Sequence, residues 1–472
     1  MEEVLERELK FDVDEHFALP HIDDFVPDTV VECSTVELCS TYYDTVDGDL
    51  QSHGMLLRRR DGEDDVGWQL KVPGGEGRIE IRTGLTETPP EELVDVLTGI
   101  RLGKPLTEVA TIRTARDRYR TVEPEGHRVC AEVDDDRVRA SIDHRLLAWR
   151  EIEIELGEAP PALARRLAKQ LTAAGARPSH HPSKLARVCG LARPQPAVDT
   201  EAGQALVDYL TRQIDGVFAG DLGLRRGSDP IHDTRVAIRR LRSTIRVFGK
   251  LLERKVIANV DDELKWFAGL LGEVRDCQVQ RNRFQKALAG IPGELVLGPV
   301  SNRITTDLRS EQLRARGRVT EAMDSQRYLD LLATLNRWRS DPPLAGSPTL
   351  TALDKRARRA LRKADQRLDE AIRAQEDAML HRARKAAKRA RYAAELRKPL
   401  DKRAKKTVKH YKRIQTVLGD HQDGVVATAT LIRLARTAGT TVGENGFTYG
   451  LLFAREQQAA EAARRSTGEL VG

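Results

Sequence analysis

The stretch Leu5-Glu6-Arg7-Glu8-Leu9-Lys10-Phe11 places a charged side chain at every second position from 6 to 10. Successive side chains of a strand point to opposite faces, so Glu6, Glu8 and Lys10 share one face. The segments RIEIR and REIEIEL repeat this alternation further along the chain. A closed barrel with a polar lumen and an outer apolar layer covered by helices explains several such strands. The alternative is a sandwich whose charged face is solvated.

Eight segments of the first half have the length of strands. They are LERELKF, STYYDT, MLLRRR, WQLKV, RIEIR, ATIRTARDRY, RVCAEVDD and LAWREIEIEL. A helix-like segment, PPALARRLAKQLTAAG, closes this half. We therefore predict an eight-stranded antiparallel β tunnel with flanking helices over residues 1–190.

The second half is rich in Ala, Leu, Arg and Glu at helical spacing. The segment His232–Arg242 matches His381–Arg391, and Leu271–Asp276 matches Leu418–Asp423, at offsets of 149 and 147 residues. Two segments that repeat in order indicate two equivalent bundles. We predict an all-α domain of two pseudo-repeated helical bundles over residues 201–465, joined to the tunnel by a Pro-rich linker, 191–200. The whole chain is then an α+β multidomain protein.

The charge divides between the two halves. Residues 1–200 hold 26 Lys and Arg against 39 Asp and Glu, a formal charge of −13, whereas residues 201–472 hold 52 against 33, a charge of +19. The basic half predicts a polyanionic partner. Aromatic residues make up only 4% of the chain, which argues against stacking of nucleic-acid bases.

Three features concern the compartment. The five cysteines are scattered, which favours a reduced chain without a zinc site. The N-terminus lacks the apolar region of a secretory signal, and no run of about 18 apolar residues exists. We expect a cytoplasmic protein with no membrane partner.

The charged strand faces separate by sign. Paired carboxylates on neighbouring strands suit a divalent cation, which can polarise a phosphoryl group and lower the pKa of an attacking water. Basic faces can neutralise a linear oligophosphate through charge-assisted bonds. The acidic positions are Glu6, Glu8, Glu132, Asp134, Glu151, Glu153 and Glu155, and the basic ones are Arg58, Arg60, Lys71, Arg78, Arg82 and either Arg113 or Arg116.

An ordered set of motifs resembles the CYTH family, the triphosphate tunnel metalloenzymes. The set comprises Glu6-Arg7-Glu8-Leu9-Lys10, Thr41-Tyr-Tyr-Asp-Thr45, Leu57-Arg-Arg-Arg60, Lys71, Glu151-Ile-Glu-Ile-Glu155 and Ser183-Lys184. Gln69 departs from the pattern, since it stands where the family usually has threonine. The resemblance covers roughly residues 1–190 and implies an eight-stranded tunnel that binds a triphosphate with two divalent cations.

The resemblance also implies roles for individual residues. Glu6, Glu8 and Lys10 are the expected catalytic residues. Metal ligands, for Mg²⁺ or Mn²⁺, are expected among Glu6, Glu8, Glu132, Asp134, Glu153 and Glu155. Phosphate ligands are expected among Arg58, Arg60, Lys71, Arg78, Arg113, Arg116 and Lys184.

Basic residues of the second half follow one helical stripe in each repeat. A stripe of like charges destabilises an isolated helix and so requires an anionic partner or compensating acids. These stripes resemble the CHAD family, the conserved histidine α-helical domains, over roughly residues 201–460. The resemblance implies binding of inorganic polyphosphate in a basic groove by His232, Arg235, Arg239, Arg242, Arg246, Lys265, His381, Arg384, Lys388, Arg391, Lys409, Lys412 and Arg413.

One position departs from the repeat, and two histidines admit two interpretations. Glu395 stands where the repeat predicts the partner of Arg246, so the second groove wall is expected to be shorter. His232 and His381 either bind phosphate or fix helix packing in the core, because the near-neutral pKa of histidine makes it a conditional phosphate ligand.

The leading hypothesis is metal-dependent hydrolysis of inorganic triphosphate or a related short triphosphate, coupled to binding of inorganic polyphosphate by the helical domain. The alternatives are a non-catalytic polyphosphate-binding adaptor, adenylate cyclase activity in the tunnel, and nonspecific nucleic-acid binding by the basic half. Specific nucleic-acid binding is not expected. Polyphosphate binding adds an expected association with polyphosphate granules to the cytoplasmic location.

Overall fold

The computed structural model describes residues 2–22, 29–62, 65–75, 77–123, 129–142, 145–156, 161–190 and 196–470. The chain divides into two compact units at the bond between Pro194 and Gln195. Part of the predicted linker, residues 191–195, lies outside the described residues, whereas residues 196–199 belong to no helix or strand. Each unit is described by itself below.

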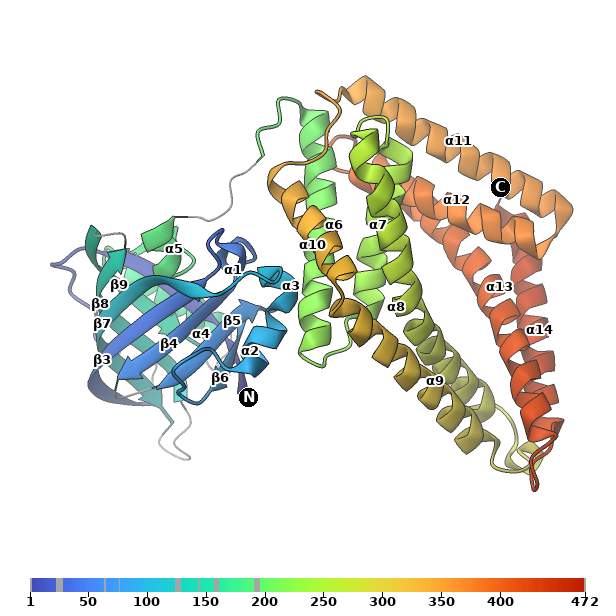
Figure 1. The fold of residues 1–472 in the computed structure, drawn as a ribbon, viewed down its shortest axis with the longest axis horizontal. Coiled ribbons are helices and arrows are strands. Elements are labelled where there is room, and N and C mark those ends of the chain that lie inside the picture. The colour runs from blue at the N-terminus through green and yellow to red at the C-terminus, as the bar shows by residue number, and fades with distance from the viewer. Residues whose placement is uncertain are drawn as a thin grey trace. The chain divides into compact units, whose positions relative to one another are not determined.

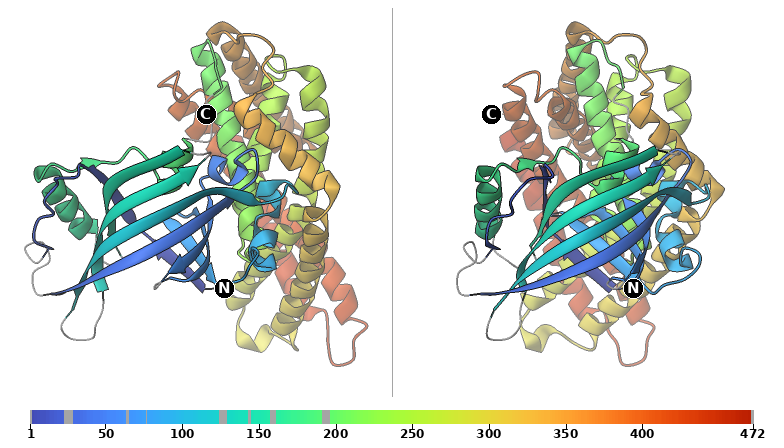
Figure 2. Two further views of the ribbon diagram at one scale, coloured as in Figure 1. Left: turned by 60° about the vertical axis from the view of Figure 1, so that its left-hand side comes forward. Right: turned by 90° about the vertical axis from the view of Figure 1, so that its left-hand side faces the viewer.

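The first unit is one sheet of ten strands that wraps into a tunnel (Figures 1 and 2). All pairs are antiparallel, in the order β1-β6-β5-β4-β3-β7-β8-β9-β2-β10. The strands are β1 (Glu2–Glu6), β2 (Glu8–Val13), β3 (Val30–Asp44), β4 (Leu56–Gly62), β5 (Gly67–Pro73), β6 (Arg78–Thr83), β7 (Thr107–Val122), β8 (Val129–Ile142), β9 (Arg145–Glu155) and β10 (Arg177–Pro178).

The predicted count of eight strands is wrong, because the N-terminal segment is interrupted at Arg7 and the dipeptide strand β10 pairs with β2. The interruption closes the tunnel. Residues of β1 pair with β6, residues of β2 pair with β9, and the Arg7 carbonyl accepts a hydrogen bond from the Leu156 amide at 2.8 Å. At the β1–β6 junction the chains approach closely. A Cβ on Gly77 would lie 2.1 Å from the Glu6 carbonyl oxygen, so only glycine fits there.

Helices cover the outside and one end of the tunnel. The short helices are α1 (Asp49–Ser52), α2 (Glu91–Val96), α3 (Thr98–Arg101), α4 (Pro161–Ala173) and α5 (Lys184–Cys189). Leu167 and Leu171 of α4 pack on the apolar face of β2, β8 and β9, in a cluster with Phe11 and Ile154. Leu185 of α5 belongs to a second cluster at strands β3, β4, β7 and β8. The first cluster is built from outward alternate positions, whereas the second lies at inward positions, since its Tyr42, Leu56 and Ile112 also line the lumen together with the charged side chains.

The second unit is helical throughout its described elements (Figure 1). Its helices are α6 (Glu201–Arg225), α7 (Ile231–Phe248), α8 (Arg254–Ala289), α9 (Val300–Met323), α10 (Gln326–Ser340), α11 (Leu350–Ala374), α12 (Asp377–Leu396), α13 (Ala404–Ala438) and α14 (Phe447–Ser466), with 3₁₀ turns η2 (Gly293–Leu295) and η3 (Thr467–Leu470). No helix among the described residues is long and apolar enough to cross a membrane.

Two hydrophobic clusters hold the helices of this unit together. One joins α11, α12 and α13 through residues such as Leu368, Leu380 and Ile414. The other joins the C-terminal ends of α8 and α13 to the N-terminal ends of α9 and α14, through residues such as Phe284 and Leu431. Helices α7 and α12, which carry the two basic stripes, contact each other directly.

Candidate functional site

The strand register sets charged residues side by side across the tunnel wall. Glu8 of β2 lies opposite Glu155 of β9, which lies opposite Glu132 of β8. The next inward row is Lys10, Glu153 and Asp134, and the row after it is Asp12, Glu151 and Asp136. The period of two in the sequence thus becomes a ladder of acids on one wall of the lumen.

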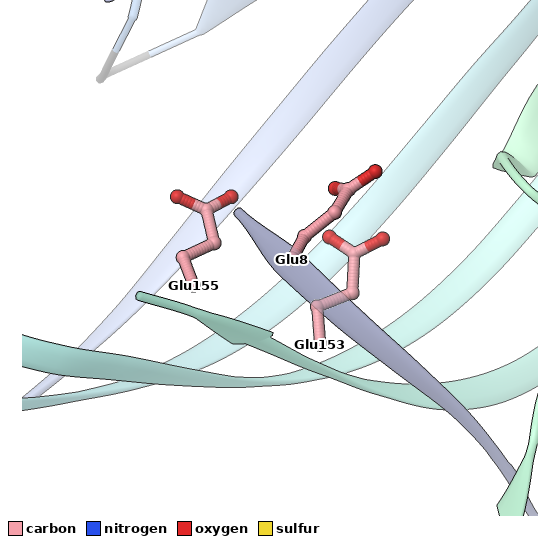
Figure 3. A group of neighbouring side chains, drawn as sticks. All are labelled: Glu8, Glu153 and Glu155. Carbon is pink, nitrogen blue, oxygen red and sulfur yellow. The ribbon is translucent and has the colours of Figure 1, made fainter. Parts of the chain in front are cut away.

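Three carboxylates of this wall gather at one point. Glu8, Glu153 and Glu155 each place an oxygen within 4.8 Å of the others. Their side chains project to the same side of β2 and β9 (Figure 3). Within the described part of the chain, Glu155 makes neither a hydrogen bond nor an ion pair, and burial raises its pKa. A half-buried carboxylate without a partner, beside two others, fits a divalent cation with oxygen ligands.

Lysines neutralise two carboxylates of this trio and two others across the lumen. The Lys10 ammonium contacts Glu153 and lies 3.1 Å from Glu8. Burial alone would raise the pKa of Glu8, but the ammonium groups of Lys10 and Lys71 hold it below its usual range. Across the lumen, Lys71 lies 2.6 Å from Glu6 and 3.1 Å from the fully buried Glu80.

Arg116 and Lys184 hold a second acidic group. The Arg116 guanidinium binds both oxygens of Asp136, at 2.8 and 2.7 Å, and one oxygen of Glu153 at 2.9 Å. Lys184 lies 2.8 Å from Asp136, 2.8 Å from Glu151 and 2.7 Å from Glu153. Ser183 fixes the turn that presents Lys184. Its hydroxyl caps α5 by accepting a hydrogen bond from the Ala186 amide. This second group is therefore charge-compensated by the protein itself.

Burial perturbs two of the carboxylates strongly. It raises the pKa of Glu6 to about 7, although Lys71 opposes the shift. It also raises the pKa of Asp134 to about 8, against the attraction of Arg116, and the charges of Glu132 and Asp136 add to the rise. Asp136 itself receives the bidentate bonds from Arg116, and its pKa is lowered. Burial therefore makes ionisation of Asp134 and of Glu6 unfavourable, and a bound cation would offset that cost.

The opposite wall is basic. Arg58 donates from Nε to Gln69 at 2.6 Å, and Arg60 donates from Nε to the Ser40 hydroxyl at 3.2 Å. Arg78 lies 3.4 Å from Glu8. These residues line one cavity together with the trio; its full lining is Glu6, Glu8, Lys10, Leu38, Ser40, Tyr42, Leu56, Arg58, Arg60, Asp65, Lys71, Arg78, Arg82, Ile112, Thr114, Arg116, Arg118, Glu132, Glu153, Glu155, Ser183 and Lys184.

Most of the residues expected in the tunnel line this cavity; Asp134, which is fully buried, and Arg113 do not. Arg113 is exposed on the outer face and does not line the cavity, because the inward positions of β7 are even-numbered there. The sequence interpretation missed Arg118, which lies 3.0 Å from Glu132, as well as Asp136 and Glu80. Extending the alternation from Arg116 by two residues would have found Arg118, and the register of β8 would have found Asp136.

The basic stripes of the helical unit are held in equivalent ways by the two repeats. Arg235 of α7 lies over Gly272 of α8, where a Cβ would come within 2.7 Å of its guanidinium, and 3.9 Å from Asp276. Arg384 of α12 lies over Gly419 of α13 and 3.4 Å from Asp423. The glycines admit the arginines, and the aspartates hold them at long range only.

Cations of the two repeats converge at this place. Burial lowers the pKa of Lys388 to about 7, and the positive charges of Arg384 and Arg239 add to the effect. Buried nitrogens of Arg235, Arg239 and Arg384 lack hydrogen-bond partners in the described structure. We call the surface formed by His232, Arg235, Arg239, His381, Arg384 and Lys388 the basic groove.

Neither histidine of the groove is a core residue. His232 is exposed and His381 is half-buried, with its Nδ1 buried and unpaired among the described residues. For His232, the alternative of a packing histidine in the core is therefore wrong. Burial and neighbouring cations lower the pKa of both imidazoles.

The remainder of the two stripes is neutralised or exposed. Arg242 and Arg246 both bind Asp261, at 2.9 and 2.8 Å. Arg391 binds Glu395, which also accepts from Arg240. Glu395 thus links α7 to α12 rather than lining a groove. The other basic residues expected to bind polyphosphate are exposed: Lys265, Lys409, Lys412 and Arg413.

Comparison with known proteins agrees with this architecture. A CYTH domain matches residues 5–188 and a CHAD domain matches residues 208–432, so the chain belongs to the family of proteins that combine these two domains. CYTH domains are metal-dependent, bind triphosphate substrates and act as triphosphatase- or cyclase-type enzymes, and CHAD domains are linked to polyphosphate.

Individual relatives share the whole arrangement or parts of it. The uncharacterized proteins Rv2226 and MT2285 of Mycobacterium tuberculosis are 35% identical over 98% of this chain and 94% of theirs. Among solved structures, PptA from Streptomyces chartreusis matches 57% of this chain and 98% of its own, at 22% identity and a TM-score of 0.48. The CHAD domain from the plant Ricinus communis matches 61% of this chain and 98% of its own, at 24% identity and a TM-score of 0.44.

Proposed function

We propose that the tunnel hydrolyses inorganic triphosphate or a related short triphosphate with the help of a divalent cation, and that the helical unit binds inorganic polyphosphate. One observation carries the proposal: a single cavity holds the carboxylate trio Glu8, Glu153 and Glu155 opposite a wall of Arg and Lys residues. A triphosphate needs both sets, since its phosphoryl oxygens require positive partners and its hydrolysis requires an activated water.

Each wall has a distinct part in the mechanism. The Arg58, Arg60 and Arg116 guanidinium groups and the Lys184 ammonium bind and align phosphoryl oxygens, which converts an encounter into a positioned complex. The trio, with Glu6, Glu132 and Asp134 nearby, would hold Mg²⁺ or Mn²⁺. A divalent cation held there would supply Lewis-acid polarisation of phosphoryl oxygen and a water of lowered pKa.

The lining disfavours cyclisation of a nucleotide. Among the residues that line the cavity, Tyr42 is the only aromatic one, and Leu38, Leu56 and Ile112 are the only aliphatic ones. Tyr42, Leu56 and Ile112 are already packed with Leu185 of α5 in a hydrophobic cluster. A base would find little apolar surface there, whereas a bare phosphate chain needs none.

Phosphate release from inorganic triphosphate tests the tunnel. Wild type and Glu6→Gln/Glu8→Gln are compared with Mg²⁺, with Mn²⁺ and with a chelator. We expect metal-dependent release that the double substitution lowers by at least about a hundredfold, the order of loss seen when one electrostatic contact to a transition state is removed. Equal release by both proteins, or no release by either while polyphosphate still binds, would refute the hydrolase and leave the adaptor; pyrophosphate release from ATP would support the cyclase.

A further inference from the structure

A second strongly basic cavity lies in the helical unit, apart from the basic groove. It is formed where the C-terminal end of α7 and the N-terminal end of α8 meet α11 and α12, and its volume is about 530 Å³. Its lining is Arg246, Val247, Gly249, Lys250, Arg254, Ile257, Arg356, Arg359, Ala360, Lys363, Ala386 and Arg389. We call it the α11 pocket. The lining holds seven cations and no carboxylate.

Most of these cations have no counter-charge. Arg246 is bound by Asp261 at 2.8 Å. The other six, Lys250, Arg254, Arg356, Arg359, Lys363 and Arg389, make no hydrogen bond or ion pair with any part of the chain that the structure describes. Arg356 in addition keeps a buried Nε without a partner. Such a set stores repulsion that an anion would relieve.

The pocket has a floor as well as a charged rim. Ile257 and Ala386 are buried beneath it, whereas Lys250, Arg254, Arg359 and Lys363 are exposed around it. The positive end of the 36-residue helix α8 lies at the same place, which adds to the attraction for an anion. The lining comes from four helices, α7, α8, α11 and α12, and from the turn that holds Lys250, so the pocket is a hollow and not one solvated helix face.

Its position relates it to the groove. Lys388 in the groove is followed by Arg389 in the α11 pocket, and both lie on α12 where it contacts α7. On α7, Arg239 and Arg246 are seven residues apart, roughly 10 Å along the helix axis. Asp261 and Glu395 neutralise the cations between them. Two unneutralised basic regions therefore flank a neutral segment.

We propose that the α11 pocket is a second phosphate-binding site, which takes phosphoryl groups of the same linear polyphosphate that the groove binds. The inference rests on the proposed polyphosphate binding. Guanidinium and ammonium groups around a small apolar floor suit a phosphoryl group, which is compact and carries several charges. An extended surface of carboxylates on a protein partner would fit this pocket less well.

The test compares two double substitutions of the same helix in the full-length protein. Arg359→Ala/Lys363→Ala removes two rim cations, and Arg362→Ala/Arg373→Ala removes two exposed cations of α11 that do not line the pocket. Affinity for long-chain inorganic polyphosphate is measured at one fixed salt concentration. We expect about a tenfold loss for the rim pair, the order of two charge-assisted contacts, and less than about a twofold loss for the control pair.

A groove variant, Arg239→Ala/Lys388→Ala, separates this inference from the function on which it rests. Loss in the groove variant with equal affinities for the rim and control pairs would overturn the pocket alone. Absence of polyphosphate binding by wild type would overturn both. Arg389→Ala, from a different helix, must reproduce the loss, and circular dichroism with thermal unfolding verifies that each variant is folded.

Discussion

In the proposed hydrolase, Lys10 competes with the metal for the carboxylates of the tunnel. Its ammonium lies between Glu8 and Glu153, two members of the trio. The side chains leave a free cavity volume of only about 50 Å³, so a substrate with its cation must part these ion pairs to enter. The cation then takes the carboxylates while the phosphates take the lysines, and the two ligands favour each other's binding.

We expect Lys10→Met to strengthen binding of Mn²⁺ in the absence of substrate, by about tenfold, because Glu8 loses its nearest ammonium group and Glu153 loses one of its three cationic partners. The same substitution should weaken binding of triphosphate. Titration calorimetry with each ligand alone measures both effects. Lys104→Met is the matched control, since Lys104 also bridges two carboxylates, Asp47 and Asp49, but does not line the cavity. Weaker Mn²⁺ binding by Lys10→Met would contradict the competition.

Lys388 makes the groove sensitive to pH. Burial, Arg384 and Arg239 lower its pKa to about 7, while Asp423 opposes the shift and Arg235 adds to it. The other titratable groups nearby are His232, His381 and Asp276, and the pKa values of both histidines are lowered. A polyanion stabilises the charged amine, so binding takes up a proton near neutral pH.

We therefore expect polyphosphate affinity to fall as pH rises from about 6 to about 8, because Lys388 loses its proton across that window. Lys388→Arg keeps the charge at every pH and should flatten the upper part of the profile, leaving the histidines to shape its acidic part. Affinities at fixed ionic strength, together with calorimetry in buffers of different ionisation enthalpy, give the proton uptake. An unchanged profile in Lys388→Arg would assign the dependence to the histidines instead.

At the scale of elements, two glycines determine how closely arginines of the basic stripes approach the neighbouring helices. Gly272 of α8 and Gly419 of α13 occupy equivalent places in the repeat and lie under Arg235 and Arg384. Glycine inside a helix is unfavourable by about 1 kcal/mol relative to alanine, so its presence in both repeats needs a reason. The close approach of a guanidinium group to the helix backbone is that reason.

Gly272→Ala should raise the free energy of unfolding by up to about 1 kcal/mol and lower polyphosphate affinity. The new Cβ would displace the flexible end of Arg235, which is only 2.7 Å away. Gly269→Ala on the same helix is the control, because nothing lies within 4 Å of its added Cβ. It should stabilise equally and leave affinity unchanged. Chemical denaturation and binding assays measure the two quantities, and equal affinities for both variants would refute the role of Gly272.

Some elements could be predicted from the sequence and others could not. The alternation of charged residues predicted which side chains of β2 and β9 face the lumen, because residues two apart in a strand point to the same face. It could not reveal the break at Arg7, since residues 5–11 read as one continuous strand and only the pairing of β1 with β6 and β2 with β9 divides them. Likewise Arg113 and Arg116 both fit the pattern locally, and only the register of β7 against β8 places Arg113 outside.

For the molecule as a whole, the charge asymmetry predicted a division into two parts, and the chain forms two compact units. The α11 pocket was not foreseen, because its cations come from two helix pairs, α7 with α8 and α11 with α12, that lie far apart in the sequence. Neutralisation of Arg242 by Asp261 and of Arg391 by Glu395 was equally hidden, since ion pairs between helices leave no periodic trace. Local patterns therefore located the stripes, whereas packing decided which of their charges stay available.

Each unit has its own hydrophobic core. In the described structure, the charged residues of the tunnel form their ion pairs within the first unit, and those of the basic groove form theirs within the second. Changes at one site should therefore be independent of changes at the other. Glu6→Gln/Glu8→Gln should abolish triphosphate turnover and leave polyphosphate affinity within about twofold of wild type, and Arg239→Ala/Lys388→Ala should do the reverse.

Tethering predicts one exception: hydrolysis of polyphosphate ends, measured at low chain concentration, should fall in the groove variant, because the groove no longer raises the local concentration of ends at the tunnel. If the groove variant instead loses turnover of free triphosphate, the two sites are coupled through the fold and the tether is not the link between them.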